Sequence, residues 1–325
     1  MISVAVCTQN RAELLENVLR TLRGQTLDPA RYEILVVDNN SSDSTRGVVE
    51  RAAAERPNVR YLFEPEIGLS HARNRAWREA AGDYVGYLDD DCEAPPHWIE
   101  AADAIARRIA PGVFGGPYFA FYRSPKPAWF KDAYGSHSLG PTPKTLRPPE
   151  FLTGGNIFFR RDLLEAVGGF DPRHGMKGGR IGYGEETALQ ILIRSHHPHE
   201  VLYYDPDLFV RHLVRPNKMD LRWVVRQRFA SGRSSFQLAS LSGASRRPRW
   251  EILLRILVAA AKLAGKSALR TVVRDRAALP YLANYWVEQG FREVECLGAL
   301  VEEWTAAPSP VLPPSSEVSA RKHAA

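Results

Sequence analysis

Cysteine is scarce in this chain, with only Cys7, Cys92 and Cys296 among 325 residues, and no two of them form a CxxC pair. A small disulfide-bonded scaffold needs paired cysteines, and a thiolate zinc site usually needs CxxC pairs, so both classes are excluded. The composition fits a protein of a reducing compartment, and we expect the catalytic part to lie in the cytoplasm.

Long hydrophobic runs are also missing, and none reaches the roughly 20 residues that a membrane-spanning helix needs. The chain begins with strand-like sequence and has no basic segment followed by a cleavable apolar stretch, so we expect no secretory signal. At 44% hydrophobic composition the chain is too apolar to be disordered. We therefore expect a large α/β domain with an appended segment.

Acidic residues are rare in one part of the chain, residues 211–276, which hold 16 Lys or Arg against 3 Asp or Glu. The whole chain has a net charge of +6, so the remaining residues are acidic overall. A concentrated positive field predicts an anionic partner such as lipid head groups, a diphosphate or a nucleic acid. A solvated basic helical surface is the alternative interpretation.

Strand-like and helix-like patterns alternate through the first hundred residues, which is typical of a nucleotide-binding α/β unit. Apolar runs predict strands at residues 2–7, 34–37, 59–63 and 84–88. Two of these strands run directly into acidic residues, at Asp38 and at Asp89-Asp90-Asp91. Since ligands bind beyond the carboxyl ends of the strands in such sheets, we expect Thr8, Asp38 and the three aspartates to converge on one crevice.

The three consecutive aspartates at the end of the fourth strand need a compensating cation, because neighbouring carboxylates raise one another's pKa. A hard divalent ion with oxygen ligands, Mg²⁺ or Mn²⁺, fits them and would also hold a diphosphate. An acidic surface turn is the alternative, and it is the more common origin of a bare DxD sequence.

Seven short motifs occur in an order and spacing that resemble the family 2 glycosyltransferases. The likeness covers about residues 2 to 215 and implies a GT-A fold, which is an α/β, Rossmann-like, mostly parallel sheet flanked by helices. Here a helical C-terminal extension would follow it. The motifs are Thr8 with Asn10 and Arg11; Val37-Asp38-Asn39 with Ser41 to Ser44; Gly68 to Asn74; Leu88 to Asp91; Gly154-Gly155-Asn156; Gly168 to Asp171; and Gly184 to Thr187.

The resemblance assigns roles on the donor side of the site. Asp38 matches the carboxylate that accepts a hydrogen bond from the base, usually uracil, whose N3 carries a proton. Asp91 matches the direct ligand of the metal, Mn²⁺ or Mg²⁺, and His212 matches a histidine that approaches it in some members. The implied substrate-binding residues on this side are Thr8, Asn10, Arg11, Asp38, Asn39, Arg73, Asp89 and Asp90. Two further implied substrate-binding residues, Gly155 and Asn156, belong to a motif that resembles the family's acceptor-side motifs.

Each of these roles has a structural alternative. Asp38 also suits a turn, because aspartate side chains bond to the backbone two residues further on. Arg73, which the resemblance places near the donor phosphates, also suits an exposed surface position. His212 is a single histidine, and such residues are more often structural than metal-bound.

Glu186 matches the acidic position that acts as general base in inverting members, where it takes the proton of the acceptor hydroxyl. Many relatives have Glu-Asp at this point, whereas this chain has Glu185-Glu186, so the choice between the two catalytic candidates stays open. Both glutamates also suit a helix N-terminus, where the helix dipole favours negative charge.

The resemblance implies an inverting enzyme that moves sugar from a nucleotide-diphosphate sugar, most simply a UDP-sugar, to a hydroxyl of a glycan or lipid-linked acceptor. Processive synthases of this family carry a Gln-x-x-Arg-Trp signature and several membrane spans, and this chain has neither. We therefore expect one or a few sugars per acceptor, in the synthesis of a cell-surface polysaccharide or glycoconjugate.

The expected organisation is a glycosyltransferase domain at residues 1–215, whose nucleotide-sugar half is 1–110 and whose acceptor half is 111–215. A basic helical region at 216–305 and a disordered tail at 306–325 follow. Four arginines early in the helical region suit a diphosphate of the donor or of a polyprenyl-diphosphate-linked acceptor: Arg222, Arg226, Arg228 and Arg233.

Within residues 250–273, cations fall on one side of a helical wheel and apolar residues on the other. Arg255, Lys262, Lys266, Arg270 and Arg274 form the basic side, opposite Leu253, Leu257, Ala261, Ala264 and Ala268. This pattern suits a helix lying on the inner face of the plasma membrane, or equally a helix packed against the main domain.

Two other functions account for parts of the sequence. A metal-dependent nucleotidyltransferase uses paired carboxylates too, but usually has an early loop rich in glycine and lysine, which residues 8–13 lack. A non-catalytic protein that binds nucleic acid or membrane would explain the basic segment alone. Aromatic residues on which bases could stack are few in that segment, so we expect no nucleic-acid partner.

Overall fold

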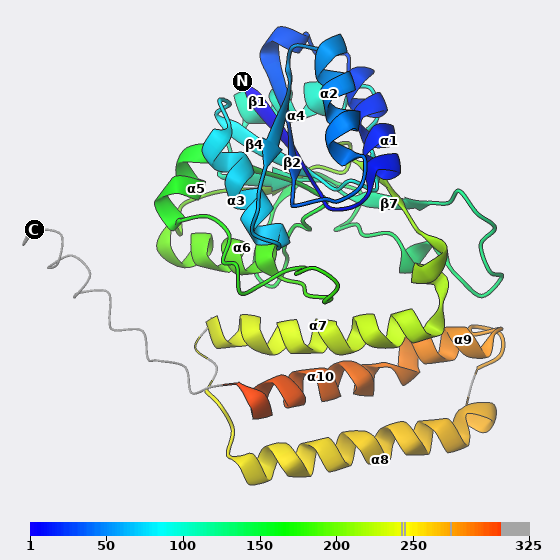
Figure 1. Cartoon of the computed structure of the whole chain (residues 1–325). Coiled ribbons are helices and arrows are strands. Elements are labelled where there is room, and N and C mark those ends of the chain that lie inside the picture. The colour runs from blue at the N-terminus through cyan, green and yellow to red at the C-terminus, as the bar shows by residue number, and fades with distance from the viewer. Residues whose placement is uncertain (242, 244, 274, 307–325) are drawn as a thin grey trace, which may run out of the picture.

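The computed structural model describes residues 1–241, 243, 245–273 and 275–306, in an α/β part followed by a layer of helices (Figure 1). The α/β part contains all the strands of the described residues, from Ile2 to Leu213. The long helices after Asp220 lie together beneath it in Figure 1.

The main sheet has eight strands in the order β3-β2-β1-β4-β9-β6-β10-β8. Its first four strands are parallel, β9 runs antiparallel to both of its neighbours, and the short edge strand β8 is antiparallel to β10. The four strands predicted in the first hundred residues are confirmed. In spatial order the strands are Val59–Phe63, Tyr32–Asp38, Ile2–Thr8, Tyr84–Leu88, Asn156–Arg160, Val113–Gly115, Leu202–Tyr204 and Lys144–Thr145.

Helices cover both faces of the sheet, which is why the central strands are buried on each side. On one face, Leu15, Val49 and Ile99 pack from α1, α2 and α4. On the other, the packing residues include Ala76 of α3 and Leu164 of α5. The six helices are α1 Ala12–Arg23, α2 Thr45–Glu55, α3 Leu69–Glu79, α4 Trp98–Arg108, α5 Arg161–Val167 and α6 Glu185–His196, with short 3₁₀ turns η1 Pro29–Arg31 and η2 Asp132–Tyr134.

A second sheet of three strands, β5 (Cys92–Glu93), β11 (Val210–Leu213) and β7 (Tyr118–Phe121), lies beside the end of β4. Its register pairs His212 with Cys92, the residue that follows the three aspartates. The backbone of Leu213 donates a hydrogen bond to the carbonyl of Asp91, at 2.8 Å. This small sheet therefore brings a late histidine to the acidic end of an early strand.

The helical layer begins with η3 (Pro216–Met219) and α7 (Leu221–Leu241), and α10 (Arg292–Thr305) packs closely along α7. Glycines make the close approach: a Cβ on Gly232 would lie 1.8 Å from the carbonyl oxygen of Glu295, and one on Gly298 would lie 2.1 Å from that of Phe229. The remaining elements are α8 Arg249–Val273, α9 Leu282–Tyr285 and the π-helical turn η4 Trp286–Gly290.

Two predictions about the C-terminal region have different outcomes. The helix expected at residues 250–273 is present as α8, and within the described part of the chain no helix has the length and apolar character to cross a bilayer. Arg274 and residues 307–325, which include nearly all of the predicted disordered tail, lie outside the described residues.

Candidate active site

A cavity of about 910 Å³ lies where β1 and β4 end, between the α/β part and α7. The end of β4 contributes Asp89, Asp90 and Asp91, and α3 and α6 contribute further charged residues. The structure brings most of the predicted site residues to this one cavity: Thr8, Arg11, Asn39, Arg73, Asp89, Asp90, Asp91, Gly155, Glu185, Glu186 and His212.

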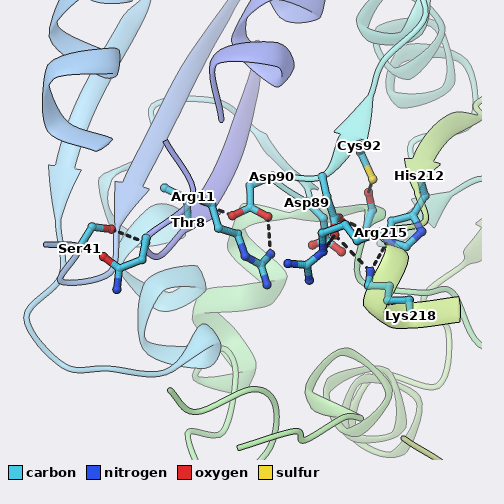
Figure 2. A network of polar contacts seen from close by, with 12 residues as sticks. Thr8, Arg11, Ser41, Asp89, Asp90, Cys92, His212, Arg215 and Lys218 are labelled. Carbon is cyan, nitrogen blue, oxygen red and sulfur yellow. Dashed lines mark hydrogen bonds and ion pairs between the residues drawn. The ribbon is translucent and has the colours of Figure 1, made fainter. Parts of the chain in front are cut away.

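Asp90 joins the ends of β4 and β1 (Figure 2). Its two carboxylate oxygens accept hydrogen bonds from the Thr8 hydroxyl at 2.7 Å and from Arg11 Nη1 at 2.6 Å. Burial raises the pKa of Asp90 to about 6, against the lowering effect of Arg11, and neighbouring Asp91 adds to the rise. Because both oxygens have protein partners, Asp90 holds Arg11 at the cavity wall and is a poor candidate for a metal ligand.

Asp91 is surrounded by cations and an imidazole. Its carboxylate lies 3.2 Å from Lys218 Nζ, 3.3 Å from His212 Nε2 and 3.9 Å from Arg215 Nε. Burial alone would raise the pKa of Asp91, but Lys218 and His212 hold it well below its ordinary value. Asp91 is therefore a fixed negative charge that faces a cation.

The residues around Asp91 fit a divalent ion. Asp91 and His212 offer one oxygen and one nitrogen as ligands. The Lys218 ammonium lies 3.2 Å from Asp91 Oδ2 and 3.3 Å from His212 Nε2, so a positive charge already occupies this position. Within the described residues, no three His, Cys, Asp or Glu side chains gather around one point. Two protein ligands suit Mg²⁺ or Mn²⁺, which commonly complete their coordination with water and substrate phosphates.

Arg73 lies fully buried at the end of the cavity nearest α6. Its Nη1 donates to Glu185 Oε1 at 2.9 Å, and its Nη2 lies 3.6 Å from Asp89 Oδ1. Burial would lower the pKa of Arg73, yet Glu185 and Asp89 raise it above its ordinary value, so the guanidinium stays charged. A Cβ on Gly154 would lie 2.5 Å from this guanidinium, which explains why glycine occupies that position.

The two candidate catalytic glutamates begin α6 but differ in their surroundings. The Glu185 side chain is 6% exposed, and among the described residues its Oε2 has no hydrogen-bond partner. The Glu186 side chain is 17% exposed and accepts from the backbone of Gly154 at 3.3 Å. Burial and the charge of Glu186 raise the pKa of Glu185 to about 8, although Arg73 acts to lower it. Of the pair, Glu186 has the freer carboxylate.

Three predicted donor-side residues hold the loops after β1 and β2 together. The buried Asp38 carboxylate accepts from the backbone of Ser41 at 2.9 Å and from the Tyr61 hydroxyl at 2.9 Å, and it does not line the cavity. Asn39 lines the cavity, and its side-chain oxygen accepts a hydrogen bond from the backbone N–H of Gly68. Asn10 lies at the protein surface, away from the cavity lining, where its carbonyl oxygen accepts from the backbone of Ser42 at 2.7 Å.

The two predicted acceptor-side residues also differ in placement. Gly155 lines the cavity, and a Cβ there would lie 2.8 Å from Asp89 Oδ2, so glycine is needed for the close approach of that carboxylate. Asn156 is fully buried behind it. Its amide donates to the carbonyls of Pro117 and Leu208 and accepts from Trp98 Nε1, which links β9 to the neighbouring chain segments.

Sequence reasoning missed several residues that line the cavity. Lys218 belongs to η3, and nothing in its local sequence distinguishes it from the other cations of the basic segment. Tyr118 of β7 packs against His212, with ring centroids 5.1 Å apart, and burial raises its pKa to about 12. Gln227 of α7 also lines the cavity. Only the folded chain brings these elements together.

Of the four arginines singled out for phosphate binding, only Arg228 lines the cavity. Arg228 also lies 3.6 Å from the Glu295 carboxylate of α10, and Arg233 donates to Glu302 of the same helix at 2.6 Å. The other three arginines do not line the cavity, because the side chains of one helix point in different directions and α10 covers part of α7.

Comparison with known proteins adds independent evidence. The sequence profile described as glycosyl transferase family 2 matches residues 3–168. The succinoglycan biosynthesis protein ExoM of Rhizobium meliloti is 30% identical over 310 residues, which cover 92% of this chain and 96% of ExoM. A glucosyl-dolichyl phosphate glucuronosyltransferase of Haloferax volcanii is 26% identical over 72% of this chain and 75% of its own.

A solved structure shares the fold at a lower level of identity. The mannosyltransferase PcManGT from Pyrobaculum calidifontis, in complex with GDP-Man and Mn²⁺, superposes with a TM-score of 0.58 at 21% identity. The match covers 93% of this chain and 85% of that one. The expected GT-A-like α/β fold with C-terminal helices is confirmed.

Proposed function

The chain belongs to glycosyl transferase family 2, and from this we propose that it moves a sugar from a nucleoside-diphosphate sugar to an acceptor hydroxyl with inversion at the anomeric carbon. The observation that carries the proposal is the placement of Asp91 and Glu186 on one cavity of about 910 Å³. A site for the leaving diphosphate and a base for the acceptor thus face the same space.

The nucleoside end of the donor belongs near Thr8 and Arg11. Asp38 lies at the end of the adjacent strand, and two protein donors use only part of its capacity, because an ionised carboxylate has about four acceptor sites. A carboxylate accepts from the N3–H of uracil, whereas cytosine N3 has no proton to donate. A UDP-sugar is our first choice of donor, and it requires the base to reach Asp38, which is buried outside the cavity lining.

The diphosphate end belongs near Asp91, His212 and Arg73. A bound Mn²⁺ or Mg²⁺, held by Asp91 and His212, would neutralise the charge that develops on the departing diphosphate. Arg73 is fixed by Glu185 and Asp89, so its guanidinium is already oriented when the donor arrives. Asp89, whose side chain is the most exposed of the three aspartates, is placed to contact the ribose or the metal's water shell.

The acceptor hydroxyl belongs near Glu186. As this hydroxyl attacks the anomeric carbon, the bond from that carbon to the diphosphate breaks, and the hydroxyl proton passes to a Glu186 oxygen. Glu186 is favoured over Glu185 because Arg73 already binds the latter and burial favours its neutral form. Glu185 then acts on Arg73 rather than on the acceptor.

The acceptor is proposed to be a glycan or a polyprenyl-diphosphate-linked glycan, extended by one or a few sugars at the cytoplasmic face of the membrane. Arg228 lines the cavity on the α7 side, where it is placed to meet an acceptor phosphate. The name of the succinoglycan biosynthesis protein ExoM supports a role in polysaccharide synthesis, and the name of the glucosyl-dolichyl phosphate glucuronosyltransferase supports a lipid-linked acceptor.

A thermal-shift panel of UDP-, GDP- and dTDP-sugars, each with Mn²⁺ or with a chelator, tests the donor. A ligand that binds only the folded state raises its stability by mass action. We expect one UDP-sugar to stabilise the protein, and to do so only when Mn²⁺ is present. During turnover this donor should release UDP rather than pyrophosphate. Release of pyrophosphate would instead indicate a nucleotidyltransferase.

A further inference from the structure

Helix α8 is the outermost element of the helical layer. In Figure 1, α10 lies between α7 and α8, and α7 is the helix that faces the α/β part. The cavity is lined from α7, so α8 lies on the opposite side of the layer from the active site. The outer side of α8 has no role in the proposed reaction.

The inner side of α8 is well packed. Ile252 and Ala259 are buried, and Leu263, which lies on the same side of the helix, packs against a cluster that includes Val294 of α10. Further along, Lys266 Nζ reaches the Glu293 carboxylate at 2.5 Å. The helix is thus fixed to α10 through one side, and its rotation about its own axis is defined.

The outer side of α8 is apolar and faces solvent. Trp250 is 69% exposed, Leu257 is 59% exposed and Leu254 is 54% exposed. Ala261 and Ala268 continue this side and are exposed as well. Within the described part of the chain these apolar side chains are therefore largely uncovered, and contiguous apolar surface of this kind marks an interaction site.

Exposed cations flank the apolar side. Arg255 and Lys262 are seven residues apart and so lie along one edge of it, and Arg249 lies at the start of the helix. Glu251 is the single acidic residue in α8, and it is paired with Arg255 at 2.9 Å. The surface is net positive, so a second copy of the chain would bring like charges together, whereas an anionic lipid surface would complement them.

We propose that the outer side of α8, defined by Trp250, Leu254, Leu257 and Ala261, docks the enzyme on an anionic lipid bilayer, with Arg255 and Lys262 among the head groups. The apolar side chains enter the boundary between head groups and acyl chains, as in other interfacial helices. The inference extends the proposed function, in which the acceptor is lipid-linked. The acceptor would explain why the enzyme docks on a membrane, but the docking itself does not depend on it.

Docking in this orientation sets the distance between bilayer and active site. The cavity lies beyond α10 and α7, roughly 20 Å from the axis of α8, because packed helices are 8–10 Å apart. That distance favours an acceptor whose glycan projects from its lipid into the cytoplasm. It also means that substitutions on the outer side of α8 leave the donor site untouched.

Flotation with phosphatidylcholine vesicles, with and without phosphatidylglycerol, tests the proposal on the full chain. We expect the parent protein to float with the anionic vesicles. Leu254→Glu with Leu257→Glu should lower the bound fraction roughly tenfold or more, because charges then replace the inserted side chains. Arg255→Gln with Lys262→Gln should lower binding to anionic vesicles by roughly tenfold.

Phe119→Glu serves as the matched control, since Phe119 is also a large exposed apolar residue, at 43%, but lies on β7. It should float like the parent. Failure of the parent to float, or unchanged flotation of the double glutamate variant, overturns the proposal. The proposal is also overturned if the parent is a dimer in size-exclusion chromatography and the double glutamate variant is a monomer.

Donor binding, measured on the same proteins by thermal shift, separates this proposal from the proposed function. Every α8 variant should bind donor and Mn²⁺ as the parent does. If no protein of the set binds a sugar nucleotide, the proposed function fails, while flotation still reports on the α8 surface.

Discussion

Lys218 Nζ lies 3.2 Å from Asp91 Oδ2, so an ammonium from the helical side of the cavity neutralises the aspartate that the sequence motif assigns to a metal ion. The same ammonium lies 3.3 Å from His212 Nε2, the second candidate ligand. Lys218 therefore neutralises the acidic site in this structure, and a divalent ion that bound between Asp91 and His212, as we propose, would have to compete with it.

Removal of the Lys218 charge should strengthen the binding of a metal ion on its own. For Lys218→Met we expect Mn²⁺ affinity without nucleotide to rise about tenfold, which corresponds to about 1.4 kcal/mol of removed competition. Titration calorimetry measures it. Lys144→Met is the control, because Lys144 pairs with Glu150 in a different part of the surface. Equal or weaker Mn²⁺ binding by Lys218→Met would show that the lysine does not compete.

Loss of the base should separate binding from turnover. Glu186→Gln should bind donor and Mn²⁺ normally but lose between about 10²- and 10⁴-fold in transfer rate, since its amide cannot take the acceptor proton. The rate of sugar transfer, measured at saturating donor, is the readout. Glu185→Gln should lose less. Near-normal turnover by Glu186→Gln, together with a larger loss in Glu185→Gln, would move the base to Glu185.

Glu185 should make the stability of the metal-free protein depend on pH. Its pKa is raised from 4.5 to about 8, so the folded state holds a proton that the unfolded chain releases, and stability falls as pH rises between these values. Glu185→Gln cannot ionise, so it should gain stability relative to the parent as pH rises through this range. Urea denaturation across the range measures the difference, and a difference that stays constant with pH would refute the shift.

The close contact of α7 and α10 should make glycine essential there. A Cβ on Gly298 would lie 2.1 Å from the carbonyl oxygen of Phe229, so we expect Gly298→Ala to lower the free energy of unfolding by about 1–3 kcal/mol. Gly265 in α8 has nothing within 4 Å of such a Cβ. Gly265→Ala should instead raise stability by about 0.5–1 kcal/mol, because alanine favours helix. Equal effects of the two substitutions in urea denaturation would contradict this packing.

The sequence allowed the first four strands of the fold to be predicted, because their signals are local. Apolar runs and the polar residues directly after them located β1 to β4 and placed Thr8 beside the aspartates, where Thr8 now bonds Asp90. Lys218 and Tyr118 were not predictable in the same way. Their positions depend on how η3 and β7 pack beside β4, and no local pattern encodes that packing.

The C-terminal region shows the same limit. The helical wheel of α8 placed five cations on one side and five apolar residues on the other, but it did not indicate which side would pack on the protein. The structure answers this through Ile252 and Ala259, which are buried, while Leu257 faces solvent. The partner helix α10, which decides the orientation, comes about 20 residues later in the chain.

The central claim is that Asp91 couples a divalent ion to a sugar nucleotide inside the cavity. Calorimetric titration of the parent and of Asp91→Asn with a UDP-sugar tests it directly, with each titration done once with Mn²⁺ and once with a chelator. Asp83→Asn is the control, because Asp83 is a surface aspartate paired with the N-terminus. The account predicts donor binding at least roughly tenfold tighter with Mn²⁺ in the parent and control, and no such gain in Asp91→Asn. Donor affinity that is the same with and without Mn²⁺ in the parent, or an equal gain in donor affinity with Mn²⁺ in Asp91→Asn, would contradict it.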